Sequence, residues 1–141
     1  MYVTAVLGLL DLETGDLSFA AAGHEPPILV PDAGAPESIQ AEGGPVLGLL
    51  PAKGYPVNAL RLSPGEAVVL FTDGVSEAAD AAGEFFGPER LVDTLRGAAH
   101  AETPAITDGV LSAVRAFAGA APQSDDITIL TLRYRPVSPT P

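Results

Sequence analysis

The spacing of apolar residues changes near the middle of this 141-residue chain, and that change restricts its fold. In the first half, apolar and β-branched runs of strand length are separated by turn residues. Such runs predict strands at 2–10, 17–23, 26–30 and within 55–72. In the second half, apolar residues recur three and four positions apart, which predicts helices that begin near Pro88 and Thr103. Strands followed by helices indicate an α+β fold, with helices on one side of an antiparallel sheet.

Turn residues connect the expected strands into two hairpins. The first hairpin turns at Gly15, which suits a tight connection between 2–10 and 17–23. The second lies within 55–72, where the sequence Ser-Pro-Gly-Glu at 63–66 predicts a β-turn. Each hairpin would place two antiparallel strands side by side.

Length and composition indicate one domain, over residues 1–135, followed by a flexible tail at 136–141. An apolar content of 47% is sufficient for a hydrophobic core. Residues 31–44 are rich in Pro, Gly, Ala and acidic side chains, and we expect them to form a loop.

Charge and cysteine content exclude several classes of function. With 18 acidic and 7 basic residues, the net charge of −11 disfavours binding to nucleic acid or to an anionic membrane. The chain has no cysteine, so disulfides, thiolate chemistry and cysteine-ligated metals are excluded. Its apolar runs are shorter than the roughly 20 residues that a membrane span needs, and no basic segment precedes the first run. A cytoplasmic protein is expected.

Two strand ends carry aspartates. The apolar run at 67–71 ends in Thr-Asp-Gly, which includes Asp73, and Asp125 opens the last expected strand, DDITILTLRYR at 125–135. Carboxylates at the rim of a sheet suit a hard cation such as Mg²⁺ or Mn²⁺. The alternative is that these residues only terminate their strands, since both sequences are common in turns. If the metal hypothesis holds, the two carboxyl groups should lie within about 8 Å of each other, because ligand oxygens lie about 2.0–2.6 Å from such a cation.

Four stretches of the chain carry a resemblance to a known family. They are residues 2–29, which include AGHEPP, 43–49 (GGPVLGL), 62–91, which include LFTDG, and 124–133 (SDDITILTLR). In this order and with this spacing, the chain resembles the metal-dependent PPM-type Ser/Thr protein phosphatases, in particular their bacterial SpoIIE-like branch. The resemblance covers most of the sequence.

The resemblance implies two stacked β-sheets flanked by helices, with two Mn or Mg ions between the sheet ends. A water activated by the metals displaces the serine or threonine oxygen from the phosphate. Asp73 and Asp125 are implied metal ligands. Asp126 stands beside the second ligand and is expected to support it, while Gly74 is the turn that frees the Asp73 carboxylate. No residue of this chain is assigned a direct catalytic role.

Three further polar residues have mainly structural interpretations. His24, in AGHEPP, could act as a general acid, but this sequence favours a turn that bends the chain between strands. Thr128 is expected to pack or to form local hydrogen bonds. His100 lies between the expected helices and should be solvated.

One departure from the family pattern limits what the resemblance implies. The family's first metal motif, of the type GD-x-S-G, supplies an aspartate that bridges both ions, and this sequence contains no counterpart of it. The family's early strands and the two helices between them also lack counterparts, so the sequence resembles the C-terminal part of the domain. Without the bridging carboxylate, Asp73 and Asp125 should hold at most one cation, and loosely.

Two functions therefore stay open. One is a phosphoserine/phosphothreonine protein phosphatase, whose branch acts on anti-sigma-factor antagonists in bacterial stress and sporulation signalling. The other is a catalytically impaired fragment or a non-catalytic module that binds a partner.

The run at 2–10 carries no charge and no proline, so it is also expected to be an unprotected sheet edge. A homo-oligomer, or association with a separate N-terminal segment, would cover that edge.

Overall fold

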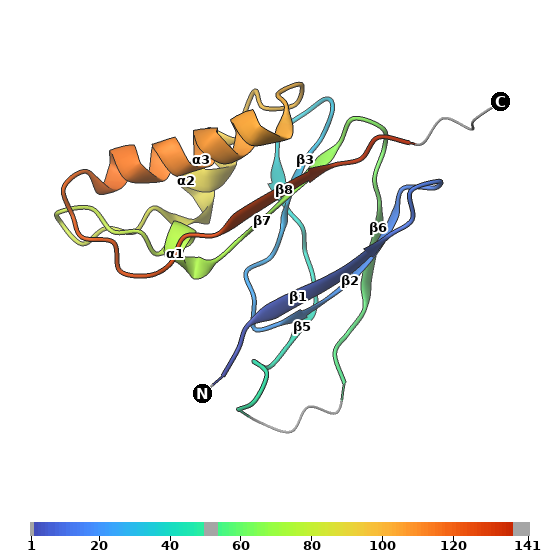
Figure 1. Cartoon of the computed structure of the whole chain (residues 1–141), viewed down its shortest axis with the longest axis horizontal. Helices are drawn as coiled ribbons and strands as arrows, with labels where there is room; N and C mark the ends of the chain where they lie inside the picture. The colour runs from blue at the N-terminus through green and yellow to red at the C-terminus, as the bar shows by residue number, and fades with distance from the viewer. Residues whose placement is uncertain (1, 50–53, 137–141) are drawn as a thin grey trace.

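The computed structural model describes residues 2–49 and 54–136. In these residues the strands form two four-stranded sheets (Figure 1). The open sheet consists of β1 (Ala5–Leu10), β2 (Asp16–Ala22), β5 (Gly43–Gly44) and β6 (Asn58–Arg61). The covered sheet consists, in spatial order, of β4 (Glu37–Ser38), β3 (Ile28–Val30), β7 (Ala67–Phe71) and β8 (Ile129–Arg133). All strand pairs are antiparallel except the short pair of β2 with β5.

Helices lie on one face of the covered sheet (Figure 1). They are α1 (Asp73–Ser76), α2 (Gly87–Thr94) and α3 (Thr103–Ala118). The predicted start of α2 is confirmed, with Pro88 in its first turn. The predicted start of α3 near Thr103 is also confirmed, since Thr103 is its first helical residue and Glu102 occupies the N-cap position.

The two-residue period of β7 divides the core into two clusters. Ala67, Val69 and Phe71 pack toward the helices, in a cluster that includes Leu91, Leu95, Ile106 and Val110. Val68, on the other face of the same strand, packs toward the open sheet with Leu17 and Phe19 of β2. The molecule is therefore layered as helices, covered sheet and open sheet, which confirms the predicted α+β fold with two stacked sheets.

The first predicted hairpin is confirmed. β1 pairs antiparallel with β2 along its whole length, from Ala5 opposite Ala22 to Leu10 opposite Leu17. Gly15 makes the turn at φ 79°, and an added Cβ there would lie 2.3 Å from the carbonyl oxygen of Leu62. Both the left-handed conformation and the lack of space require glycine.

The second predicted hairpin is wrong. The turn at 63–66 exists, and the amide of Glu66 donates to the carbonyl of Ser63. However, β6 pairs with β2 in the open sheet, whereas β7 pairs with β3 and β8 in the covered sheet. The turn carries the chain from one sheet to the other. A local turn sequence fixes the reversal of the chain but not the partner of each strand.

The predicted loop at 31–44 contains two short strands, β4 and β5, each of two residues. Such brief pairing at a sheet margin leaves no periodic signal in the sequence. Of the predicted tail, residue 136 is described and residues 137–141 lie outside the described part. Among residues 2–49 and 54–136, no helix is both long and apolar enough to cross a bilayer.

Candidate functional site at the ends of β7 and β8

The buried strand β7 delivers Asp73 to the surface. The strand ends at Phe71, Thr72 has extended backbone at the N-cap position, and Asp73 is the first residue of the one-turn helix α1. The Asp73 side chain is exposed, and its Oδ1 accepts a hydrogen bond from the amide of Gly74 at 3.0 Å. The strand is held by the core while the carboxylate at its end faces solvent.

Hydrogen bonds join this strand end to the entry of β8. The amide of Thr72 donates to the carbonyl of Thr128 at 3.1 Å. The Thr72 hydroxyl donates to the carbonyl of Asp126 at 2.8 Å and accepts from the amide of Thr128 at 2.9 Å. Thr72 and Thr128 are 56 positions apart in the sequence. These hydrogen bonds therefore hold the two aspartate-bearing segments side by side. The sequence interpretation missed Thr72. Its position directly before the strand-end aspartate could have indicated a role in holding that strand end.

Gly74 has a different role from the predicted one. It lies inside α1, is buried, and does not adopt a left-handed conformation, so it is not the turn that was expected. A Cβ at this position would lie 2.5 Å from the carbonyl oxygen of Asp126 and 3.2 Å from that of Asp125. Glycine is required because the segment with the second aspartate crosses directly over α1.

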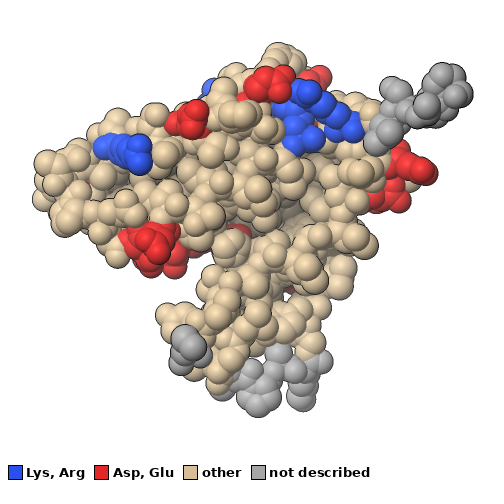
Figure 2. All heavy atoms as spheres, viewed as in Figure 1, with Lys and Arg blue, Asp and Glu red and all other residues tan. Residues whose placement is uncertain are grey.

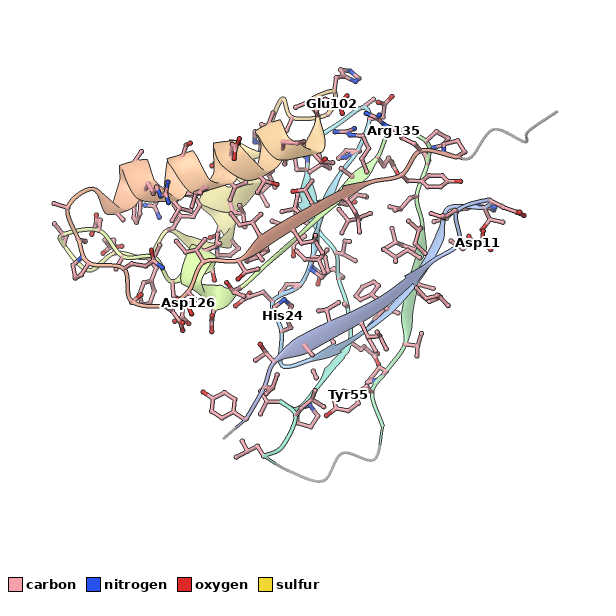
Figure 3. All side chains as sticks on the ribbon, viewed as in Figure 1. Asp11, His24, Tyr55, Glu102, Asp126 and Arg135 are labelled. Carbon is pink, nitrogen blue, oxygen red and sulfur yellow. The ribbon has the colours of Figure 1, made fainter. Side chains whose placement is uncertain are left out.

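Asp125 and Asp126 are both exposed on that segment. Oδ1 of Asp125 accepts from the amide of Asp126 at 2.7 Å, and the side-chain amide of Gln123 donates to the carbonyl of Asp125 at 2.7 Å. Figure 3 shows Asp126 at the α1 end of the molecule, and Figure 2 shows a cluster of acidic side chains at that end. The local charge is therefore negative and open to solvent.

The donor set suits a hard cation in part. Carboxylate oxygens are the ligands that Mg²⁺ and Mn²⁺ prefer, and Asp73 and Asp125 offer them from adjacent segments. In the described part of the chain, however, no group of three or more His, Asp or Glu side chains is arranged to hold a metal ion. Residues 2–49 and 54–136 therefore supply carboxylates of a suitable kind without completing a metal site.

A hollow between the two sheets reaches the same strand ends. It measures about 210 Å³ and brings His24 together with Thr72 and Thr128. Apolar side chains from β1, β7 and β8 form the rest of its wall. His24 follows the end of β2 and precedes β3, so the predicted bend between strands is confirmed, and the bend carries the chain from the open to the covered sheet.

The two remaining predicted residues are placed as follows. Thr128 forms the backbone hydrogen bonds to Thr72 described above, which confirms its local role. The side chain of His100 is 82% exposed, as expected, and its Nδ1 lies 3.4 Å from Oδ1 of Asp32 on the loop after β3. His100 does not take part in the site.

Comparison with known proteins identifies relatives of this chain. Residues 1–135 match the family described as Stage II sporulation protein E (SpoIIE). Protein IcfG of Synechocystis sp. is 33% identical over 135 residues, which are 96% of this chain and 21% of IcfG. The SiaA-PP2C domain of Pseudomonas aeruginosa is 28% identical, with a TM-score of 0.81 over 95% of this chain and 52% of that one. The chain thus spans about half of the SiaA domain and about a fifth of IcfG.

More distant structures show the same fold. The phosphatase domain of SpoIIE from Bacillus subtilis, presoaked in Mn, has a TM-score of 0.68 at 18% identity, over 97% of this chain and 59% of that one. RsbX in complex with magnesium has a TM-score of 0.60 at 16% identity, over 91% of this chain and 54% of that one. The match over residues 1–135 and the identity to IcfG together show that the chain belongs to the SpoIIE family, and the similar solved structures include PP2C phosphatase domains.

Proposed function

We propose that this chain forms part of a metal-dependent phosphatase that removes phosphate from serine or threonine side chains of a protein. The observation that carries the proposal is the pairing of the two aspartate-bearing segments through Thr72. This pairing holds Asp73 and Asp125 at one end of the sandwich, on a rigid strand and an adjoining loop. Family membership supports a phosphatase in regulatory signalling.

Asp73 and Asp125 are the proposed metal ligands. Asp126 would support the second ligand through its backbone, and Gly74 would allow the two segments to approach. The fold relatives studied with Mn and with magnesium support either ion. Bound there, the ion would compensate the phosphate charge and lower the pKa of a water molecule. Among the described residues, no third His, Asp or Glu side chain forms a metal-binding group with these two.

The shape of the site favours a phosphate carried on a protein. Both aspartates are exposed, and the neighbouring hollow is a shallow cavity of about 210 Å³. Sites for free small molecules enclose most of their ligand in a concave pocket of about 300–1,000 Å³. A phosphorylated side chain on a protein surface fits the open arrangement. By resemblance to the family, we propose an anti-sigma-factor antagonist as the substrate and the cytoplasm as the location.

The alternative is a catalytically impaired fragment or a partner-binding module. This alternative rests on the sequence, which contains no counterpart of the family's GD-x-S-G motif with its bridging aspartate. The two proposals differ in one measurable property, which is the hydrolysis of a phosphate ester.

Hydrolysis of 4-nitrophenyl phosphate with Mn²⁺ tests the proposal. We expect little turnover by the 141-residue chain alone and clear turnover once a segment that carries the family's GD-x-S-G motif is joined to its N-terminus. In the active form, Asp73→Asn and Asp125→Asn should each lower kcat/KM by about 100-fold or more, since even outer partners of metal ligands contribute about 10–100-fold. The matched control Asp108→Asn changes an exposed aspartate on α3 and should have no effect.

Three results would contradict this interpretation. Equal activity of the wild type and both aspartate variants would remove Asp73 and Asp125 from the site. Strong activity of the 141-residue chain, abolished by Asp73→Asn, would show that no further ligand is needed. Carboxyl groups of Asp73 and Asp125 more than about 8 Å apart in a metal-bound structure would also exclude a shared ion.

A further inference from the structure

His24 lies at the end of the sandwich that carries Asp73 and Asp125, where a tightly packed bend precedes it. Gly23 precedes it at φ 59°, and the Gly23 amide donates to the carbonyl of Gly44 at 2.8 Å. A Cβ on Gly23 would lie 2.4 Å from Cγ1 of Val46, and one on Gly44 would lie 2.4 Å from Cδ1 of Tyr55. The backbone before His24 therefore has little freedom, which fixes where the side chain of His24 leaves the main chain.

That position faces the strand ends that carry the aspartates. His24 is half-buried and shares its hollow with Thr72 and Thr128, which flank the aspartate-bearing segments. Figure 3 shows the His24 ring between the two sheets, on the side of Asp126. The hydrogen bonds at this end join Thr72 to the entry of β8, and none of them uses the imidazole. Among residues 2–49 and 54–136, no hydrogen bond occupies the ring nitrogens, so they can act on a bound molecule.

We propose that His24 donates the proton to the ester oxygen that leaves during hydrolysis. This inference rests on the proposed phosphatase function. A serine or threonine alkoxide is a strongly basic leaving group, so its departure is faster when a proton is transferred to it. Imidazole is the side chain best suited to give up a proton near neutral pH, and general acid catalysis contributes about 10²–10⁴-fold.

The step balances as follows. The oxygen of a water molecule forms a bond to phosphorus, and the bond from phosphorus to the ester oxygen breaks. The electron pair of that bond stays on the ester oxygen, which takes the proton from His24 and leaves as the free hydroxyl. The attacking water gives one proton to solvent, and the neutral imidazole takes one back before the next turnover. Neither oxidation nor reduction occurs.

Two substrates with different leaving groups test the assignment in the chain joined to a segment that carries the GD-x-S-G motif. A phosphoserine peptide releases a basic alkoxide, whereas 4-nitrophenyl phosphate releases a stable phenolate that needs no proton. His24→Gln should lower kcat/KM for the peptide by about 10²–10⁴-fold and change that for 4-nitrophenyl phosphate by less than about threefold. A merely structural role would lower both rates equally. The control His100→Gln alters the other, exposed histidine and should change neither rate.

Binding gives a second readout that does not depend on turnover. With Mg²⁺ present, inorganic phosphate should shift the ring resonances of His24 in the wild-type NMR spectrum and leave those of His100 in place. Three results would each overturn the assignment. They are an equal loss of kcat/KM on both substrates, full activity of His24→Gln on the peptide, and His24 resonances that phosphate does not shift. Wild-type protein that hydrolyses neither substrate would instead refute the proposed function itself.

Discussion

The covered and open sheets have similar strands but very different environments. In the covered sheet, β7 is buried on both faces, with Ala67 and Val69 at 0% exposure, because helices lie on one side and the open sheet on the other. In the open sheet, β1 places Val6 and Leu10 against the core but exposes Leu7 and Leu9 at 78% and 77%. Apolar side chains on two strands of similar composition can therefore be fully buried on one strand and more than three-quarters exposed on the other. The difference comes from what packs on their outer faces.

The candidate site depends on this asymmetry. The covered sheet fixes the ends of β7 and β8 through a well-packed core, so Asp73 is carried by rigid backbone. The open sheet contributes the bend with His24 and an edge strand, β1, that pairs only with β2 among the described residues. Four measurements test the contrast, from the largest expected effect to the smallest.

Truncation of a side chain in each sheet should give the largest difference. Ile28→Ala in β3 removes a side chain with 1% exposure and should lower the free energy of unfolding by about 2–5 kcal/mol, because it leaves a cavity against the helices. Leu9→Ala in β1 should change it by less than about 0.5 kcal/mol. Urea denaturation of both variants measures the difference. Similar losses would mean that the outer face of β1 is covered in solution.

Glycine replacement within helices tests the contact between the two aspartate-bearing segments. Gly74→Ala should destabilise the protein by about 1–3 kcal/mol, because its Cβ would meet the carbonyl oxygen of Asp126 at 2.5 Å. Gly109→Ala is the matched control: it lies in α3 with nothing within 4 Å of the added Cβ. Because alanine favours helices, this control should stabilise by about 0.5–1 kcal/mol. If both substitutions shift the midpoint of thermal unfolding in the same direction, the close approach of Gly74 and Asp126 is contradicted.

Self-association tests the exposed edge of the open sheet. β1 has no charged residue, and its outward leucines are exposed, so the 141-residue chain should associate as its concentration rises. Replacing Leu7 and Leu9 together by lysine should weaken association at least about tenfold, or roughly 1.4 kcal/mol. Sedimentation over a dilution series measures this. A wild-type monomer at high concentration, with amides of β1 protected from hydrogen exchange, would contradict the prediction.

Acid titration of Asp11 should show the smallest effect. Its carboxylate accepts hydrogen bonds from the amides of Thr14 and Glu13 in the β1–β2 turn, and these bonds lower the pKa of Asp11 below its ordinary value of 3.8. A lowered pKa in the folded state means that the stabilisation is complete above the ordinary value and is lost as pH falls through the folded one. The difference in stability between wild type and Asp11→Ala should therefore vanish in strong acid. NMR titration of the Asp11 carboxyl carbon would contradict this if the midpoint lay above 3.8.

Local chemistry determined much of what could be predicted from the sequence. The change of apolar period predicted strands before helices, and Gly15 and Pro88 marked a turn and a helix start that the structure contains. These features depend on residues close together in the chain, which is why the sequence contains enough information to predict them. The resemblance to the SpoIIE-like phosphatases followed from short motifs in a fixed order, and the family comparison confirms it.

Only the tertiary structure decided which strands pair and which segments meet. The turn at 63–66 predicted a hairpin, but β6 and β7 joined different sheets, because strand partners are selected by burial of their faces against distant residues. The contact of Gly74 with Asp126, and the approach of His24 to Thr72 across two sheets, likewise depend on non-local packing. The sequence by itself determined the local elements and the aspartates at the strand ends. Tertiary packing determined that these ends lie together, since long-range pairing depends on the whole core and not on neighbouring residues.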